Sequence, residues 1–155
     1  MARPDDYRFA NLERHVGHDF GVSAPIRLPQ ARIDQFAEAT GDHQWIHVDV
    51  ARARAQSPFG GPVAHGFLTL ALVASAMDEL GIVPDDATAA FNYGVEKVRF
   101  LAPVLAGSQI RVRCVLQAVE ARGEARMLLR ITGKVEIENS EKPALIGEFL
   151  ALVQG

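Results

Sequence analysis

The second half of the chain repeats its hydrophobic positions every second residue. In residues 110–118 and 126–138, apolar side chains alternate with charged or polar ones. Such alternation is typical of antiparallel strands that bury one face. Two further strands are predicted in "AFNYGVEKVRFLAPV" (90–104) and "LIGEFLALV" (145–153), and the segments "ARGEA" and "ENSEKP" supply turns. The pattern therefore predicts four strands after residue 89.

The first half of the chain changes to a helical period. Ile33 and Phe36 fall at helical spacing within 29–40, Pro29 suits a first helical turn, and Gly41 suits the residue that follows a helix. Residues 41–49, "GDHQWIHVD", come next, and we expect irregular backbone there. The segment "ARARAQSPFGGP" begins with helix-forming residues and ends as a Gly/Pro loop.

Residues 63–80, "VAHGFLTLALVASAMDEL", are apolar almost all round until Asp78 and Glu79. This composition predicts a central helix enclosed by the rest of the protein. Four or five antiparallel strands with one apolar face must bury that face, so we expect the sheet to curl around this helix. The prediction is an α+β hot-dog fold. An exposed edge strand in such a sheet favours self-pairing, so we also expect a homodimer.

Composition narrows the setting. A chain of 155 residues fits one domain, spanning 1–155. A net charge of −3 without a basic run argues against a nucleic-acid partner. The longest strongly apolar stretch, residues 66–77, is shorter than the ~18–20 residues that span a bilayer, so no membrane partner is expected. Cys114 is the only cysteine, which fits a reducing cytoplasm.

The segment "GDHQWIHVD" concentrates polar side chains. His43 and His47 share the spacing of the H-E-x-x-H zinc motif, but Gln44 replaces the glutamate and the segment does not resemble a helix, so no metal is predicted. Asp42 and His47 stand five residues apart across a bend, where a carboxyl and an imidazole form an acid/base pair if they converge. A solvated aspartate in a helix-terminating turn is the alternative.

The loop "PFGGPVAHGF" leads into the predicted central helix. The first turn of a helix exposes backbone N–H groups, so the N–H of Gly66 is our candidate donor to an oxyanion or a thioester carbonyl. Gly66 is equally explained by close packing of the helix on the sheet. For His65 we expect only a local hydrogen bond. Dinucleotide, P-loop and serine-hydrolase motifs are absent from the sequence.

Three segments together, "FAEATGDHQWIHVD", "PFGGPVAHGFLTLAL" and "NYGVEKVRFLAPVLAGS", resemble the MaoC-like dehydratase family. This family includes R-specific enoyl-CoA hydratases and small single-hot-dog 3-hydroxyacyl-thioester dehydratases. The resemblance implies that Asp42 and His47 are the catalytic pair and that the amide of Gly66 polarises the thioester carbonyl. Two departures stand out. Trp45 lies where the family usually has proline, and Ala74 lies where some members carry a serine.

The activity implied by the resemblance is reversible hydration of trans-2-enoyl thioesters to R-3-hydroxyacyl thioesters. No metal or redox cofactor is implied, and coenzyme A, or an acyl carrier protein, belongs to the substrate. We expect Trp45, Phe67 and Tyr93 to line an acyl tunnel or to belong to the core. Asn92 is expected to bond near the thioester or to form a turn.

Basic residues are candidates for contacts with the phosphates of coenzyme A, or else form a solvated face: Arg52, Arg54, Lys97 and Arg99. Two other functions stay open. One is an acyl-thioester binding protein without activity. The other is a hot-dog thioesterase, which needs a carboxylate near the helix start, whereas Asp78 and Glu79 lie at the far end of the helix.

Overall fold

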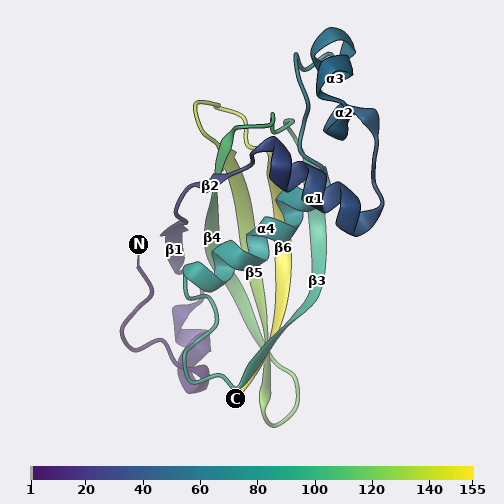
Figure 1. Ribbon diagram of the computed structural model, residues 1–155. Helices are drawn as coiled ribbons and strands as arrows, with labels where there is room; N and C mark the ends of the chain where they lie inside the picture. The colour runs from purple at the N-terminus through teal and green to yellow at the C-terminus, as the bar shows by residue number, and fades with distance from the viewer. Residues whose placement is uncertain (1) are drawn as a thin grey trace.

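The computed structural model describes residues 2–155 and contains one six-stranded antiparallel sheet (Figure 1). The strands lie in the order β1-β4-β5-β6-β3, and the short β2 also pairs with β4. Their bounds are β1 (Asp19–Val22), β2 (Ile26–Arg27), β3 (Ala89–Phe100), β4 (Gln109–Ala121), β5 (Arg126–Ile137) and β6 (Leu145–Gln154). The four predicted strands, β3 to β6, are therefore confirmed.

The sequence pattern did not reveal β1 and β2. These strands have four and two residues, which is too short to show an alternation of polar and apolar positions. β1 also contains Gly21 at a positive φ of 87°, where the register shifts. The carboxylate of Asp19 accepts a hydrogen bond from the Gly21 N–H at 2.8 Å and stabilises this bend. β1 depends on pairing with β4, which its own sequence does not encode.

Five helical segments accompany the sheet. Their bounds are η1 (Phe9–His15), α1 (Gln30–Thr40), α2 (Trp45–Val48), α3 (Val50–Gln56) and α4 (Gly66–Glu79). α1 begins after Pro29 and ends at Gly41, which has a left-handed φ of 79° and donates its N–H to the Ala37 carbonyl at 2.8 Å. This helix and its glycine stop were predicted.

The expectation of irregular backbone after Gly41 is correct only for residues 41–44. Trp45–Val48 forms a single helical turn, α2, despite its β-branched and aromatic residues. Asp49 follows it and caps α3, because its carboxylate accepts the N–H of Arg52 at 3.0 Å. The turn is held by its neighbours, which outweigh the local preference for extended backbone.

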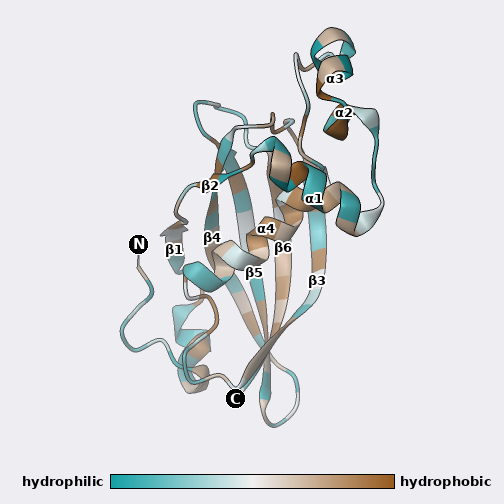
Figure 2. Ribbon diagram, viewed as in Figure 1, coloured by the Kyte–Doolittle hydropathy of each residue, from teal (hydrophilic) through white to brown (hydrophobic). Residues whose placement is uncertain are grey.

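α4 lies across one face of the sheet, with hydrophobic residues along most of its length (Figures 1 and 2). This confirms the α+β class with a sheet around a central helix. The helix is enclosed on one side only, because Phe67, Ala71 and Ala74 are exposed in the single chain. The buried side consists of Leu68, Thr69, Val73, Ala76 and Met77. Among residues 2–155, no helix is long and apolar enough to cross a membrane.

β3 forms one edge of the sheet. Within the described chain it pairs with β6 alone. Almost all of its residues are exposed, including Phe91, Tyr93 and Val95, whose side chains are 53%, 59% and 50% accessible. A long edge strand with exposed apolar side chains is a template for pairing with another chain.

Candidate active site

His47 is held by a backbone carbonyl on the loop before α4. Its Nδ1 lies 2.6 Å from the carbonyl oxygen of Val63, so Nδ1 carries the proton and donates it. The N–H of Val63 donates in turn to the carbonyl of Ile46 at 3.0 Å. This pair of hydrogen bonds fixes the imidazole tautomer and leaves Nε2 as the proton-accepting nitrogen.

Burial decides the protonation state of His47. The residue is only 7% exposed, and this burial lowers the pKa of the imidazole below its ordinary value. The hydrogen bond to Val63 and the charge of Asp42 raise the pKa, while His65 lowers it, and the net shift is downward. At neutral pH the ring is therefore uncharged and can accept a proton.

Asp42 comes from the exposed loop between α1 and α2. One of its carboxylate oxygens and one ring nitrogen of His47 belong to a group of atoms that all lie within 4.8 Å of one another. A single water that hydrogen-bonds to both groups fits a separation of this size. The fold thus brings together the two residues that the sequence predicted as an acid/base pair.

Gly66 is the first residue of α4, so its N–H has no acceptor within the helix. Both explanations that the sequence left open apply to it. A Cβ at this position would lie 2.9 Å from Cε1 of Phe100, so the ring packs where a side chain would stand. Gly66 also lines a hollow of about 270 Å³ beside the site, together with Phe59 and Phe100. The position therefore combines close packing with an accessible amide.

His65 joins the pair, which the sequence did not predict. Its Nε2 lies 2.9 Å from the backbone carbonyl oxygen of Asp42, 23 residues away, so the expectation of a local hydrogen bond is wrong. Its ring stacks on that of His47, with centroids 3.9 Å apart and planes at 27°. The only signal in the sequence was a histidine directly before the predicted oxyanion glycine.

Two histidines and a carboxylate within 4.8 Å also raise the question of a metal ion. Ring nitrogens bind metals through lone pairs in the ring plane, and a tetrahedral ion needs those lone pairs to converge. The rings of His47 and His65 are stacked, so their lone pairs run nearly parallel. His43 lies apart, with Nδ1 3.7 Å from a carboxylate oxygen of Glu38. The arrangement suits proton transfer better than metal coordination.

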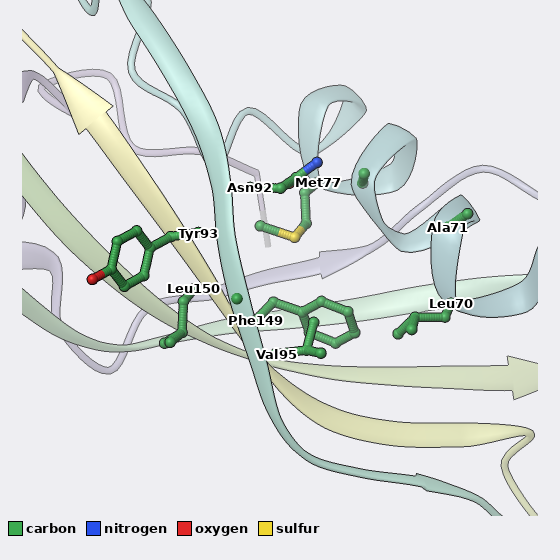
Figure 3. Close-up of a pocket in the computed structure, with 10 residues that line it drawn as sticks. Leu70, Ala71, Met77, Asn92, Tyr93, Val95, Phe149 and Leu150 are labelled. Carbon is green, nitrogen blue, oxygen red and sulfur yellow. The ribbon is translucent and has the colours of Figure 1, made fainter. Parts of the chain in front are cut away.

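An apolar pocket of about 350 Å³ runs between α4 and the strands β3 and β6 (Figure 3). It begins at Leu70, one helical turn after Gly66, and extends along the helix to Met77. Tyr93 and Asn92 line it, as do Ala71, Ala74, Gly94, Val95, Phe149 and Leu150. The predicted place of Tyr93 in an apolar channel thus agrees with the structure.

Asn92 does not lie near the predicted thioester position. Phe100 packs against Gly66, and Asn92 stands eight residues earlier on β3, which corresponds to roughly 26 Å of extended strand. In Figure 3 its amide lies near Met77, beside the second half of α4. Within one chain, Asn92 therefore belongs to the far end of the pocket and not to the Gly66 end.

Trp45 and Phe67 do not line the apolar pocket either. The guanidinium of Arg52 lies 4.3 Å from the centroid of the Trp45 ring, so this side chain joins α2 to α3. Phe67 is 68% exposed and makes an edge contact with Phe100, at 6.0 Å between centroids. Neither residue belongs to the buried core.

The predicted phosphate contacts are also distributed differently. Lys97 is bonded to Glu148 at 2.6 Å, and Arg99 donates to the neighbouring carbonyl of Val98 at 2.8 Å. Arg54 lines a hollow of about 430 Å³ that includes the Gly60–Gly61 turn. Arg54, on α3, is therefore better placed for a phosphate than Lys97.

Comparison with known proteins identifies the family. The model of the MaoC-like domain matches residues 11–139, which include the residues of the site. The chain belongs to the MaoC-like dehydratase family. It is 43% identical to Nodulation protein N of Rhizobium leguminosarum bv. viciae over 146 residues, covering 94% of this chain and 90% of that protein. It is also 43% identical to 3-hydroxyacyl-thioester dehydratase Z of Mycobacterium tuberculosis (strain ATCC 25618 / H37Rv), over 91% of this chain and 92% of that protein.

Solved structures agree on the architecture of this MaoC-like chain. The unliganded R-hydratase PhaJ1 from Pseudomonas aeruginosa superimposes with a TM-score of 0.71, at 23% identity, over 90% of this chain and 81% of that one. This likeness shows a shared hot-dog fold.

One departure from the family pattern can now be placed. Ala74 lines the apolar pocket, whereas Ser75 donates its hydroxyl to the carbonyl of Leu72 at 2.9 Å and does not line that pocket. Ser75 therefore does not replace the serine that some MaoC-like members carry one position earlier.

We expect the His47 imidazole to titrate below the value of about 6.5 that is typical of an exposed histidine. Its ring should stay neutral as the pH falls from 7, because burial opposes the charged form. NMR of the 15N-labelled protein, with the His47 signal assigned by its loss in H47Q, measures the midpoint and shows whether Nδ1 carries the proton. A midpoint at or above 6.5 would contradict the electrostatic account.

Proposed function

We propose that this protein catalyses the reversible hydration of trans-2-enoyl thioesters to R-3-hydroxyacyl thioesters. The observation that carries the proposal is the Asp42/His47 pair beside the first amide of α4, in a chain of the MaoC-like dehydratase family. Membership in this family supports a lyase-type reaction on a thioester. The 43% identity to a 3-hydroxyacyl-thioester dehydratase supports the same substrate class.

The site suggests how the reaction proceeds. A water held between Asp42 and His47 adds its oxygen to C3 of the enoyl chain, and the pair accepts the proton that this oxygen loses. The thioester carbonyl gains negative charge, which the N–H of Gly66 stabilises at the positive end of α4. The pair then delivers a proton to C2, so that one water is consumed and no other reactant is needed.

The apolar pocket supplies a place for the acyl chain. It starts one turn beyond Gly66 and continues along α4, so a chain attached to a thioester at Gly66 would extend toward Met77 and Asn92. Its volume of about 350 Å³ lies within the range of small-molecule sites. We therefore assign the acyl group to this pocket and the thioester to its Gly66 end.

The thioesterase alternative lacks a suitable carboxylate on α4. Asp78 and Glu79 stand 12 and 13 residues after Gly66, which places them roughly 18–20 Å along the helix. Glu79 also accepts the N–H of Ala24 at 2.7 Å, so it ties the helix end to the chain after β1. The same pair of proton-transfer groups argues against a protein that only binds thioesters.

We expect Asp42→Asn and His47→Gln each to lower the rate of crotonyl-CoA hydration by roughly 10²–10⁴-fold, because each removes one proton-transfer group. The loss of enoyl absorbance measures hydration, and a thiol reagent measures release of coenzyme A in the same sample. Circular dichroism checks that both variants fold.

His43→Gln is the matched control for these variants. His43 lies in the same loop but is about half exposed, and it faces Glu38. Its hydration rate should stay within about twofold of the unaltered protein, as for an ordinary surface change. Full activity in both D42N and H47Q would overturn the assignment, and thiol release without hydration would support the thioesterase.

We further propose that two copies of this chain associate through β3. This strand is the edge of the sheet, and it exposes Phe91, Tyr93 and Val95. The exposed side of α4, with Phe67 and Ala71, lies on the same open pocket side as β3. A second copy paired along β3 would satisfy the edge and cover these side chains.

We expect light scattering after size exclusion to give about twice the 16.8 kDa mass of the chain. Replacing Val95 with lysine places a charge on the edge strand and should shift the protein toward the monomer. The matched control is Arg111→Lys on β4, which lies away from this edge. A monomer in the unaltered protein would contradict the proposed association.

We expect Ala74→Leu to shorten the acyl pocket and to discriminate against long chains. The variant should lower kcat/KM for trans-2-octenoyl-CoA about tenfold or more relative to crotonyl-CoA, since a misfit of a few methylenes costs that much. Ser75→Leu adds the same volume on a neighbouring residue that does not line the pocket and should leave the ratio unchanged. Equal loss on both substrates in A74L would refute the acyl assignment.

A further inference from the structure

The loop that carries Asp42 has little to hold it. Residues 41–44 have no regular structure, and their mutual hydrogen bonds are long: His43 N–H to the Gly41 carbonyl at 3.2 Å, and Gln44 N–H to the Asp42 carboxylate at 3.3 Å. Among the residues that the structure describes, one hydrogen bond joins this loop to a distant part of the chain. It is the bond from His65 Nε2 to the Asp42 carbonyl oxygen, at 2.9 Å.

The ring that makes this bond is itself immobilised. His65 is 2% exposed. Its ring stacks on His47 at 3.9 Å between centroids and contacts Phe36 at 5.0 Å, with planes at 53°. The position of the His47 ring is therefore set by the Val63 carbonyl through Nδ1 and by the face of His65.

The backbone of His65 is fixed by α4. It is the N-cap residue of the helix, and its carbonyl accepts the N–H of Thr69 at 3.1 Å. The next residue is Gly66, the candidate oxyanion donor. One residue thus contacts the backbone of Asp42, the ring of His47 and, through the chain, the amide of Gly66.

A space-filling role does not explain this histidine. Because Nε2 donates to a carbonyl, Nε2 carries the ring proton, and Nδ1 is left as a buried acceptor with no partner among residues 2–155. An apolar side chain of similar size would fill the same volume without leaving an acceptor unpaired. The polar ring is explained by its hydrogen bond to the Asp42 loop.

We propose that His65 is a positioning residue, which holds the Asp42 loop and the His47 ring in register with the first turn of α4. The part of this inference that concerns turnover rests on the proposed hydratase function. The structural part, that His65 orders residues 41–48, does not depend on it.

Two substitutions separate the hydrogen bond from the ring. His65→Phe keeps an aromatic ring against His47 but removes the donor to Asp42. His65→Gln removes the ring but keeps an amide N–H that reaches the place of Nε2. The matched control is His15→Phe, another largely buried histidine with an unpartnered Nε2, which contacts Tyr7 away from the site.

The first measurement is amide hydrogen exchange of residues 41–48, with mass spectrometry, in each full-length variant. We expect H65F to exchange at least several-fold faster in this segment only, H65Q to approach the unaltered protein, and H15F to leave the segment unchanged. Unchanged exchange in H65F, or equal acceleration in H65F and H65Q, would overturn the proposal. This readout stands even when no hydratase activity is found.

The second measurement is the kinetics of crotonyl-CoA hydration. We expect H65F to lower kcat about 10–100-fold with little change in KM, because misplacing reacting groups by about 1 Å costs this much. H65Q should recover most of kcat. A kcat for H65F within twofold of the unaltered protein would contradict the positioning role, whereas a complete lack of activity in the unaltered protein would contradict the proposed function.

Discussion

The burial of one face of α4 against the sheet is the constraint on which the rest of the structure depends. Val73, Ala76 and Leu68 on the helix pack with the apolar faces of β4 and β5, including Ile110 and Ile131. Burial of such side chains is the largest favourable contribution to folding. Because the helix occupies this face, its two ends and its exposed side are fixed relative to the strands.

The site follows from where that helix begins. The first turn of α4 places the amide of Gly66 and the ring of His65 beside the loop that follows α1. The bond from His47 Nδ1 to the Val63 carbonyl then ties α2 to the segment before the same turn. Polar groups thus gather at one helix end, while the rest of α4 borders an apolar pocket. A reaction that needs proton transfer at one end of an acyl chain matches this division.

The sequence predicted the elements that carry a strong periodic signal: α1 with its glycine stop, α4, and the strands β3 to β6. It also selected Asp42, His47 and Gly66, because their types and order are unusual within otherwise apolar or simply charged surroundings. Periodicity could not reveal β1, whose four residues depend on pairing with β4. It could not place Asn92 either, because distance along α4 is a property of the assembled sheet.

His65 shows the limit of reading a chain locally. Its partners, Asp42 and His47, lie 23 and 18 positions earlier, and only the docking of the α1–α2 loop on α4 brings them together. A histidine before a helix has ordinary explanations that use neighbouring residues alone. Contacts of this kind emerge from the packing of separate segments, and a pattern of residue types along one segment does not encode them.

The central claim is tested most directly by the product that the unaltered protein forms from crotonyl-CoA in D2O. The account predicts R-3-hydroxybutyryl-CoA with a single deuteron at C2 and no free thiol, as chiral chromatography, mass spectrometry and a thiol assay would show. Release of coenzyme A, a racemic product, or no reaction across enoyl chains of several lengths would contradict it.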